Sequence, residues 1–364
     1  MSRPSAAMAV RYEDELKLFR SGASKAAVVV AIIVWLILPQ SLDNFWLLIL
    51  NYAGIAAIGA IGLNLLTGFT GQVSLGHAFF IGCGAYTAAW FGVEQELPLV
   101  VWLPLCGIIG ATIGAVVGPF ALRLRGQYLV IVTLGLVFFA GHLFDNWTSV
   151  TGGGNGTPSN APLVLGPVDF ADLKLFGTSY DTEQGVFWLV WALVAVAALL
   201  AKNLVRSRPG RAMQAVRDRD VAAEVVGVSL ARYKIGAFAV SSAMAAVAGG
   251  LLGSFQGYVV PGEFGDSAGL LLSIQYIAII IIGGVGTIFG SVLGAIALGA
   301  LPQLIQEYSD RIPLISSGDL IPIDSLNIVI FGLLIVLFLM FEPRGLAAVW
   351  LRLKAYFKSW PFSY

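Results

Sequence analysis

The chain has two histidines among its 364 residues, and one stands in a stretch whose residue types could do chemistry. His77 lies in "GFTGQVSLGHAFFIGCGAY", which runs from Gly68 to Tyr86 between two apolar segments. A metal site needs Cys, Asp, Glu or a second His at ligand spacing, and His142 stands in another apolar segment. A proton relay would need a carboxylate partner, which the stretch lacks. We therefore expect no metal site and a neutral imidazole that bonds a backbone carbonyl of a neighbouring helix.

Other polar side chains also stand inside apolar segments, where each is costly unless it has a partner or a function. Two explanations fit them. They line a path for a polar solute, or they form hydrogen bonds between helices, worth about 0.6–2 kcal/mol each. The sequence leaves both open. The candidates for a translocation path are Asn64, Gln72, Ser74, His77, Ser273 and Gln275.

The elements that must position these residues are membrane helices. The chain is 58% hydrophobic and 12% charged, with a mean hydropathy of +0.85, whereas a soluble domain is about half apolar and a quarter charged. Its net charge of zero gives no reason to expect nucleic acid as a partner. Because one crossing takes about 20 apolar residues, we predict an all-α integral membrane protein, a polytopic bundle of about ten helices. The predicted spans are 26–43, 45–66, 73–93, 99–121, 128–147, 185–205, 235–257, 267–283, 287–305 and 325–342.

Basic residues orient these spans, since cytoplasmic loops of membrane proteins carry an excess of Lys and Arg. With the N-terminus in the cytoplasm, ten spans put all but two of the 21 Lys and Arg residues inside. The exceptions are Lys174 and Arg311. The sequence therefore predicts a multi-pass protein with both termini in the cytoplasm.

Residues 26–345 form the predicted transmembrane domain, and three polar regions stand out along the chain. Residues 1–25 carry apolar residues at helical spacing, which fits an interfacial amphipathic helix and a tail with chance periodicity equally well. Residues 346–364 are predicted to be a cytoplasmic tail. The outer loop 148–184 contains "TGGGNG" without the Lys-Ser/Thr of a phosphate-binding loop, so we expect a small periplasmic cap there.

The long cytoplasmic loop 206–234 is basic and predicts two short helices. After a Pro-Gly stop, the first begins near Arg211. Asp220 suits the N-cap of a second helix over 221–226, and Gly227 suits its C-terminal stop. Six residues give about 9 Å of helix, which can only lie across the cytoplasmic face. Its small apolar residues favour docking into a groove of a partner, and a solvated basic loop is the plainer alternative.

This loop resembles the EAA loop of ABC importer permeases, whose core is Glu-Ala-Ala, three residues and Gly. Here Ala222-Ala223-Glu224-Val225-Val226-Gly227 has the acidic residue after the alanines, as in the looser form of the branched-chain amino acid permeases. Three further stretches resemble the LivM-type permease subunit of these importers. They are "GLNLLTGFTGQVSLGHAFFIGCGAY", "IIGGVGTIFGSVLGA" and "FEPRGL", and with "TGG" they fall in order between residues 60 and 346.

The resemblance implies a transport subunit of the bacterial inner membrane that is not itself an enzyme. It implies a second, LivH-like permease, a periplasmic binding protein, and two LivG/LivF-like ATPases that bind the ATP, so this chain needs no cofactor. Branched-chain amino acids are the expected substrates, and urea or short amides are the alternative. The residues expected to couple the ATPases are Gly210, Arg211, Arg217, Asp220, Ala222, Ala223, Glu224 and Gly227. The glycines expected to form turns at inner helix ends are Gly68, Gly71, Gly283 and Gly286.

Two other classes of protein fit the sequence less well. An ion- or proton-driven secondary transporter would need paired carboxylates in mid-span, and Asp145 and Glu263 stand only near outer ends. A membrane enzyme would need a convergent set of polar residues, which no segment supplies.

Overall fold

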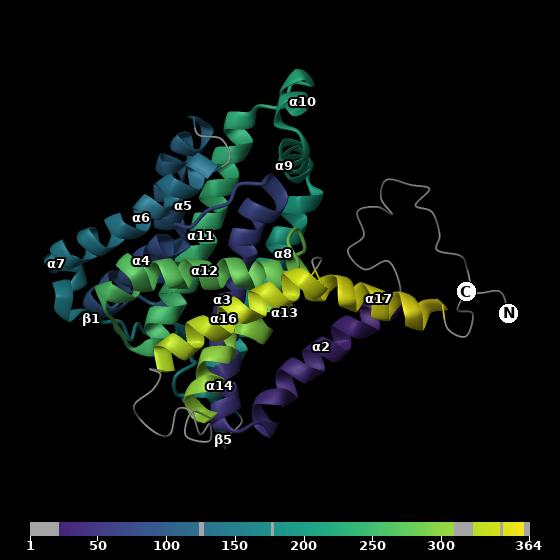
Figure 1. Ribbon diagram of the computed structural model, residues 1–364. Coiled ribbons are helices and arrows are strands. Elements are labelled where there is room, and N and C mark those ends of the chain that lie inside the picture. Colours follow the sequence, from purple (N-terminus) through teal and green to yellow (C-terminus); the bar gives the residue numbers. More distant parts are fainter. Residues whose placement is uncertain (1–21, 124–126, 176–177, 309–322, 343–344, 360–364) are drawn as a thin grey trace.

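The computed structural model describes residues 22–123, 127–175, 178–308, 323–342 and 345–359. The predicted N-terminal segment lies outside these residues except for 22–25, and Arg311 lies outside them as well. Long helices form the body of the molecule (Figure 1). They are α2 Gly22–Ser41, α3 Asn44–Thr70, α4 His77–Ala88, α5 Leu99–Arg123, α6 Gln127–Asn146, α8 Thr182–Arg206, α11 Leu230–Gln256, α12 Asp266–Gly283, α13 Ile288–Gly299, α14 Leu301–Tyr308, α16 Ile323–Phe341 and α17 Gly345–Ser359.

Seven stretches of the described chain are long and apolar enough to cross a membrane. They are Asn44–Thr70, Leu99–Phe120, Tyr128–Asn146, Thr182–Arg206, Leu230–Gln256, Asp266–Gly283 and Ile288–Ile305. Each matches a predicted span, so the all-α membrane class is confirmed. The other three predicted spans fall on α2, on α4 with the helix that follows it, and on α16. The count of ten therefore stays a prediction.

Helix α3 lies at the centre and contacts α8, α11, α12 and α13. Glycines let these neighbours approach closely. A Cβ atom at Gly54 would lie 2.6 Å from Val190 of α8, and one at Gly59 would lie 2.6 Å from Tyr276 of α12. Lipid supplies no hydrophobic drive between helices, so this close packing must hold the bundle together.

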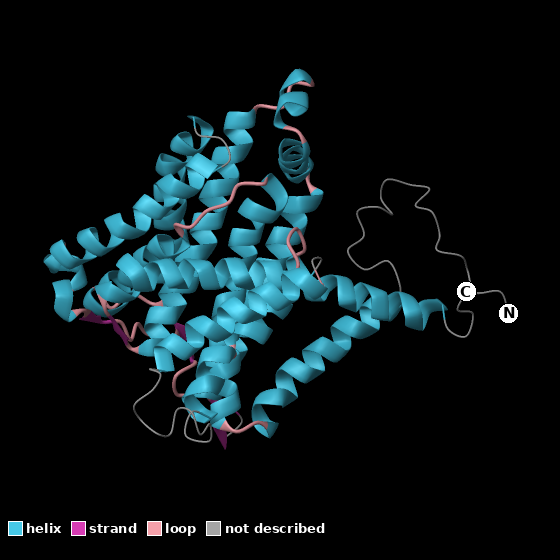
Figure 2. Cartoon of the chain, in the orientation of Figure 1, coloured by secondary structure: helices cyan, strands magenta, loops and turns pink. Residues whose placement is uncertain are grey.

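The third predicted span is broken. Residues 71–76 form an extended stretch after α3, and Figure 2 shows it as a loop that runs from the end of α3 back to α4. Helix α4 begins only at His77, and the π-helix η1, Ala89–Glu94, continues it. The prediction of a helix from residue 73, after a simple turn at the cytoplasmic side, is wrong because Gly71 stops α3 and the side chains that follow alternate between exposed and buried.

Loop 148–184 carries short elements at the end of the molecule opposite α9, Arg208–Asp218, and α10, Asp220–Val225 (Figure 1). Strand β1 pairs antiparallel with β6, which follows α11 and thereby ties the loop to the bundle. The η3 turn, Pro261–Glu263, leads into α12. The short elements of the loop are α7 Thr148–Thr151, η2 Gly153–Asn155, β1 Thr157–Pro158, β2 Val164–Leu165, β3 Val168–Asp169, β4 Lys174–Leu175 and β5 Thr178–Ser179, and β6 is Tyr258–Val259.

The predicted C-terminal tail contains a helix, α17. Its first residue, Gly345, has a φ of 72°, and a Cβ atom there would lie 2.7 Å from Gly284 between α12 and α13. The glycine of "FEPRGL" therefore rests on the second glycine-rich turn.

Candidate coupling site

Helix α9 begins at Arg208, earlier than the predicted start near Arg211. Ser207 is its N-cap, with the hydroxyl oxygen accepting a hydrogen bond from the backbone N–H of Gly210 at 3.5 Å. Pro209 fits the first turn because proline lacks the N–H that a helix start leaves unpaired. The Pro-Gly pair therefore starts the new helix rather than only ending the old one.

Helix α9 rests on the bundle through its apolar side and through Gly210. Met213 and Val216 are buried, and a Cβ atom at Gly210 would lie 2.2 Å from the carbonyl oxygen of Leu204. No side chain fits there without moving backbone, so α9 is pressed against the end of α8. The guanidinium of Arg211 adds a hydrogen bond to the carbonyl of Arg206 at 3.0 Å.

Helix α10 projects from the same end (Figure 1). Asp220 is its first residue rather than its N-cap, which is Arg219, because the helical backbone already includes Asp220. Gly227 follows the helix with a φ of 87°, as expected of a C-terminal glycine stop. Ala223 is buried, whereas Ala222, Glu224 and three valines are exposed, with Val225 83% exposed. The exposed valines are Val221, Val225 and Val226.

The two glycine-rich turns meet under α9. Gly71 and Gly286 carry positive φ values of 71° and 79°, so they form the turns themselves. Gly68 and Gly283 lie inside helices instead, where close approach explains them. A Cβ atom at Gly68 would lie 2.5 Å from the backbone nitrogen of Gly286, and one at Gly283 would lie 2.0 Å from the carbonyl oxygen of Gly290. The two glycine-rich turns, which are distant in sequence, are thus in contact.

Arg217 of α9 reaches both turns. Its guanidinium donates a hydrogen bond to the carbonyl oxygen of Gly68, the helical glycine near the end of α3. Its stem lies over Gly71, whose Cβ atom would stand 3.4 Å from Cγ of Arg217. A Cβ atom at Gly286 would lie 2.9 Å from its Nη1. One side chain of α9 therefore contacts the ends of two central helices.

Asn64 holds the second turn from the inside. Its Nδ2 donates to the carbonyl oxygen of Thr287 at 2.9 Å and to Oγ of Ser291 at 2.7 Å, and its Oδ1 accepts from the backbone N–H of Gly286 at 2.8 Å. Asn64 is 1% exposed, so these bonds satisfy a polar side chain that could not be left unpaired in the bundle.

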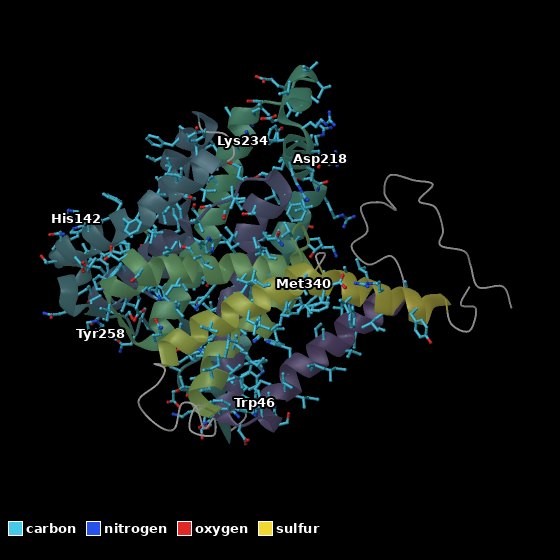
Figure 3. All side chains as sticks on the ribbon, in the orientation of Figure 1. Trp46, His142, Asp218, Lys234, Tyr258 and Met340 are labelled. Atoms are coloured by element: carbon cyan, nitrogen blue, oxygen red, sulfur yellow. The ribbon has the colours of Figure 1, made fainter. Side chains whose placement is uncertain are left out.

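A second connection joins α10 to the start of α11. The carboxylate of Asp220 pairs with the Lys234 ammonium at 3.9 Å. The carbonyl oxygen of Lys234 accepts a hydrogen bond from Nε2 of Gln72 at 3.4 Å, and Nε2 also donates to Oγ1 of Thr70 at 3.0 Å. Figure 3 shows Lys234 and Asp218 at this end of the molecule and His142 and Tyr258 away from it.

Backbone N–H groups of the stretch 71–76 and of the start of α4 donate hydrogen bonds to side-chain hydroxyl oxygens. Backbone N–H groups of Leu75 and Ala78 donate to hydroxyl oxygens of Thr133 on α6 and Ser273 on α12, both at 3.0 Å. Oγ of Ser74 accepts from the N–H of Gly76 at 3.3 Å. Irregular backbone at membrane depth must be satisfied within the protein, so these hydroxyls explain how the break is tolerated.

His77 stands at the start of α4 and is 2% exposed. Its ring lies 4.7 Å from the ring of Tyr276, centroid to centroid. No group of three or more His, Cys, Asp or Glu side chains gathers anywhere in the described part of the chain. Gln275, two residues after Ser273, is half-buried on another side of α12.

Comparison with known proteins bears on this arrangement. Residues 45–339 match the family model described as "Branched-chain amino acid transport system / permease component". The chain belongs to this family. It is 33% identical over 301 residues to the high-affinity branched-chain amino acid transport system permease protein LivM of Escherichia coli K12, and to that of Salmonella typhimurium; each alignment covers 79% of this chain and 66% of the relative. It is 27% identical over 267 residues to LivH of E. coli K12, covering 69% of this chain and 82% of LivH. No solved structure matches the chain.

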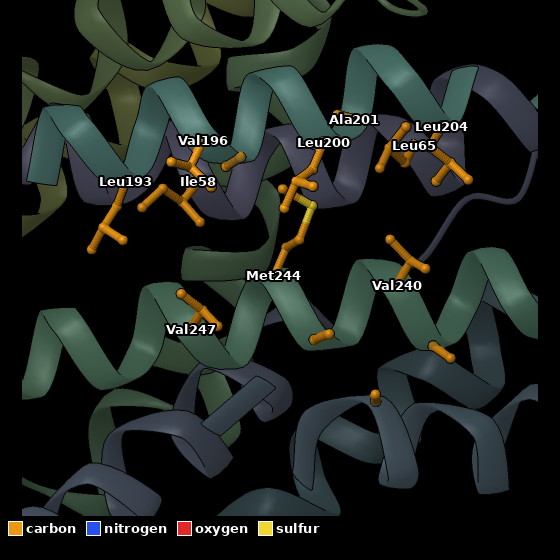
Figure 4. Close-up of a pocket in the computed structure, with 14 residues that line it drawn as sticks. Ile58, Leu65, Leu193, Val196, Leu200, Ala201, Leu204, Val240, Met244 and Val247 are labelled. Atoms are coloured by element: carbon orange, nitrogen blue, oxygen red, sulfur yellow. The ribbon is translucent and has the colours of Figure 1, made fainter. Parts of the chain in front are cut away.

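The permease also contains an apolar cavity of about 470 Å³ between α3, α5, α8 and α11 (Figure 4). Its 14 lining residues, which include Ile58, Leu200 and Met244, are all apolar. A zwitterion would find no hydrogen-bonding side chain there, and none of the six predicted path residues lines it.

Several residues of the site had no distinctive signal in the permease sequence. Thr133, Tyr276 and Ser291 are isolated polar residues in apolar helices, and Lys234 is one of many basic residues in its loop. A search for every small polar residue inside a predicted span would have found Thr133 and Ser291. Only the packing of the helices shows which backbone groups they serve.

Proposed function

We propose that this chain is the membrane-spanning permease subunit of an ATP-driven importer of branched-chain amino acids. It lies in the bacterial inner membrane with both termini in the cytoplasm. A periplasmic binding protein delivers leucine, isoleucine or valine, a LivH-like permease completes the pore, and two cytoplasmic LivG/LivF-like ATPases bind the ATP. The observation that carries the proposal is the family match over residues 45–339, together with identity to LivM proteins.

The coupling role of α9 and α10 rests on their surfaces and bonds. Exposed Val221, Val225 and Val226 give α10 an apolar surface that suits a groove of a soluble partner better than water. Movement of that surface would act on the bundle through Arg217, which contacts both glycine-rich turns. A push by the ATPases would therefore shift the ends of α3 and α12, and rocking of the two permeases would open the pore alternately.

We propose that Gln72 and His77 contribute most to the translocation path. Oε1 of Gln72 and Nε2 of His77 are buried and find no hydrogen-bond partner among the described residues. Such atoms cost free energy until water or a solute meets them. Asn64, Ser74 and Ser273 already bond backbone or side-chain groups, which supports a mainly structural role for them, and Gln275 is a peripheral candidate.

The experiment that tests the substrate is uptake of labelled leucine by proteoliposomes that contain the complete importer and the binding protein. Excess unlabelled valine and isoleucine are expected to compete, and excess urea or acetamide is not. Competition by urea or acetamide, with none by valine, would establish the alternative substrate class instead.

A further inference from the structure

The outer end of the molecule, opposite α9 and α10, holds a buried hydroxyl without a partner. Tyr86 of α4 is 3% exposed, and its ring packs 4.8 Å from that of Phe144 and 6.3 Å from that of Phe264, centroid to centroid. Its hydroxyl finds no hydrogen-bond partner among the described residues. An unpaired buried hydroxyl is unfavourable, so a bound hydrogen-bond partner would lower the free energy.

A carboxylate stands next to this aromatic cluster. Glu263 directly precedes Phe264, whose ring packs against that of Tyr86, and its negative charge disfavours ionisation of the Tyr86 and Tyr52 hydroxyls. Burial raises the pKa of Glu263, because the charged form is partly removed from water. In the part of the chain that the structure describes, no Lys, Arg or His pairs with this carboxylate. A cation placed beside Glu263 would offset its desolvation.

An aromatic cavity adjoins the ring of Tyr86. Its volume is about 330 Å³, and α4, η1, α5, α6 and α7 line it. The π-helix η1 contributes Trp90 and Phe91, Phe144 lies near the end of α6, and Trp147 stands between α6 and α7. Ligand sites are usually apolar and aromatic cavities of this size or larger with a few polar groups that orient the ligand. No polar residue lines the 470 Å³ cavity, whereas Tyr86 is among the residues that line this one and its hydroxyl is unpaired.

We infer that this outer cluster is a binding subsite for a small primary ammonium compound with an apolar side chain. The ammonium group lies between the carboxylate of Glu263 and the hydroxyl of Tyr86, and the apolar side chain enters the aromatic cavity. For a zwitterion, the carboxylate must point away from Glu263, because Asp145 adds a second negative charge near Tyr86. The inference deepens the proposed function, on which it rests: the subsite receives the amino acid on the outer side.

Direct binding tests the subsite without ATP, transport or the binding protein. The purified complete importer in lipid nanodiscs is titrated with leucine, leucinamide, 4-methylpentanoate and urea, and saturation-transfer NMR reports binding. Leucine and leucinamide are expected to bind, since both keep the ammonium group. Methylpentanoate, which lacks it, and urea, which has no charge, are expected not to bind.

Variants assign the binding to these residues. A hydrogen bond to a charged group contributes about 1.5–3 kcal/mol, so Glu263→Gln should weaken leucinamide binding about tenfold or more. Tyr86→Phe should weaken it severalfold, Glu263→Asp should keep part of it, and the control Glu94→Gln, an exposed outer carboxylate, should not change it.

Equal binding of leucine and methylpentanoate, or unchanged affinity in both Glu263→Gln and Tyr86→Phe, would overturn the subsite. The subsite would also be overturned if Glu263→Gln and Tyr86→Phe lost leucine uptake only because the binding protein attached more weakly. If leucine is imported normally but never binds here, the subsite is wrong and the proposed function stands. If leucinamide binds here but no amino acid is imported, the proposed function fails instead.

Discussion

Arg217→Met should separate ATP hydrolysis from uptake. Methionine keeps most of the apolar stem that covers Gly71 but has no group to donate to the carbonyl oxygen of Gly68. A hydrogen bond to a charged group contributes about 1.5–3 kcal/mol, and because Arg217 is an exposed residue we take the lower end. A loss of about 1.4 kcal/mol corresponds to a factor of ten. The number of leucine molecules imported per ATP hydrolysed should therefore fall about tenfold.

The assay is paired measurement of ATP hydrolysis and labelled leucine uptake in proteoliposomes with the complete importer. Arg219→Met is the matched control, because it removes the same charge from the same loop without touching the glycine-rich turns. Hydrolysis should persist in both variants, and the ratio of uptake to hydrolysis should drop only for Arg217→Met. An equal ratio in both variants, at equal amounts of assembled importer, would refute the coupling role of Arg217.

Three further predictions concern residues at the same end of the molecule as Arg217. Gly227→Pro should lower uptake per ATP because proline cannot adopt the φ of 87°. Glu224→Arg should lower it because the arginine reverses a charge on the exposed face of α10. Full uptake in these variants would exclude α10 as the coupling helix. Gly210→Val should prevent α9 from seating on α8 and lower the temperature at which the purified importer unfolds; a matched Gly262→Val change, where a Cβ atom meets no atom within 4 Å, should not. Asn64→Ala should lower that temperature more than either, since it leaves the N–H of Gly286 unpaired, and an unchanged midpoint would contradict the role given to Asn64.

The sequence predicted the elements of the coupling site well. Proline, glycine and aspartate signals mark the ends of α9 and α10 within a few residues, because turn chemistry is local. The left-handed glycine at 227 and the turns at Gly71 and Gly286 follow from the same local rule. Long apolar runs predicted ten spans, and seven of them match helices that are long and apolar enough to cross a membrane.

The break before His77 could not be predicted in the same way. Residues 73–93 are apolar enough to suggest one continuous helix, whereas hydroxyls from α6 and α12 accept hydrogen bonds from the backbone of the break and of the start of α4. Those hydroxyls belong to Thr133 and Ser273, which are distant in sequence. A hydropathy pattern contains no information about which distant side chain will satisfy a given backbone group.

Contacts between distant segments could not be predicted from the sequence either. Arg217 and Gly68 are separated by 149 positions, and Asn64 and Ser291 by 227. Each residue was a candidate for its own reason, Arg217 as a coupling residue and Asn64 as a path residue. Their junction through the two glycine-rich turns appears only when α3, α9, α12 and α13 are packed together.

The most direct test asks whether ATP hydrolysis or an ion gradient drives transport. It measures leucine uptake into proteoliposomes in which ionophores have dissipated all ion gradients. The vesicles contain this chain, its partner permease and both ATPases, with binding protein outside the vesicles and ATP on the side of the ATPases. The proposed function predicts that uptake persists with ATP and stops when ATP is replaced by a non-hydrolysable analogue. Loss of uptake in the presence of the ionophores, with uptake in their absence that needs no ATP hydrolysis, would show an ion-driven transporter and contradict the proposal.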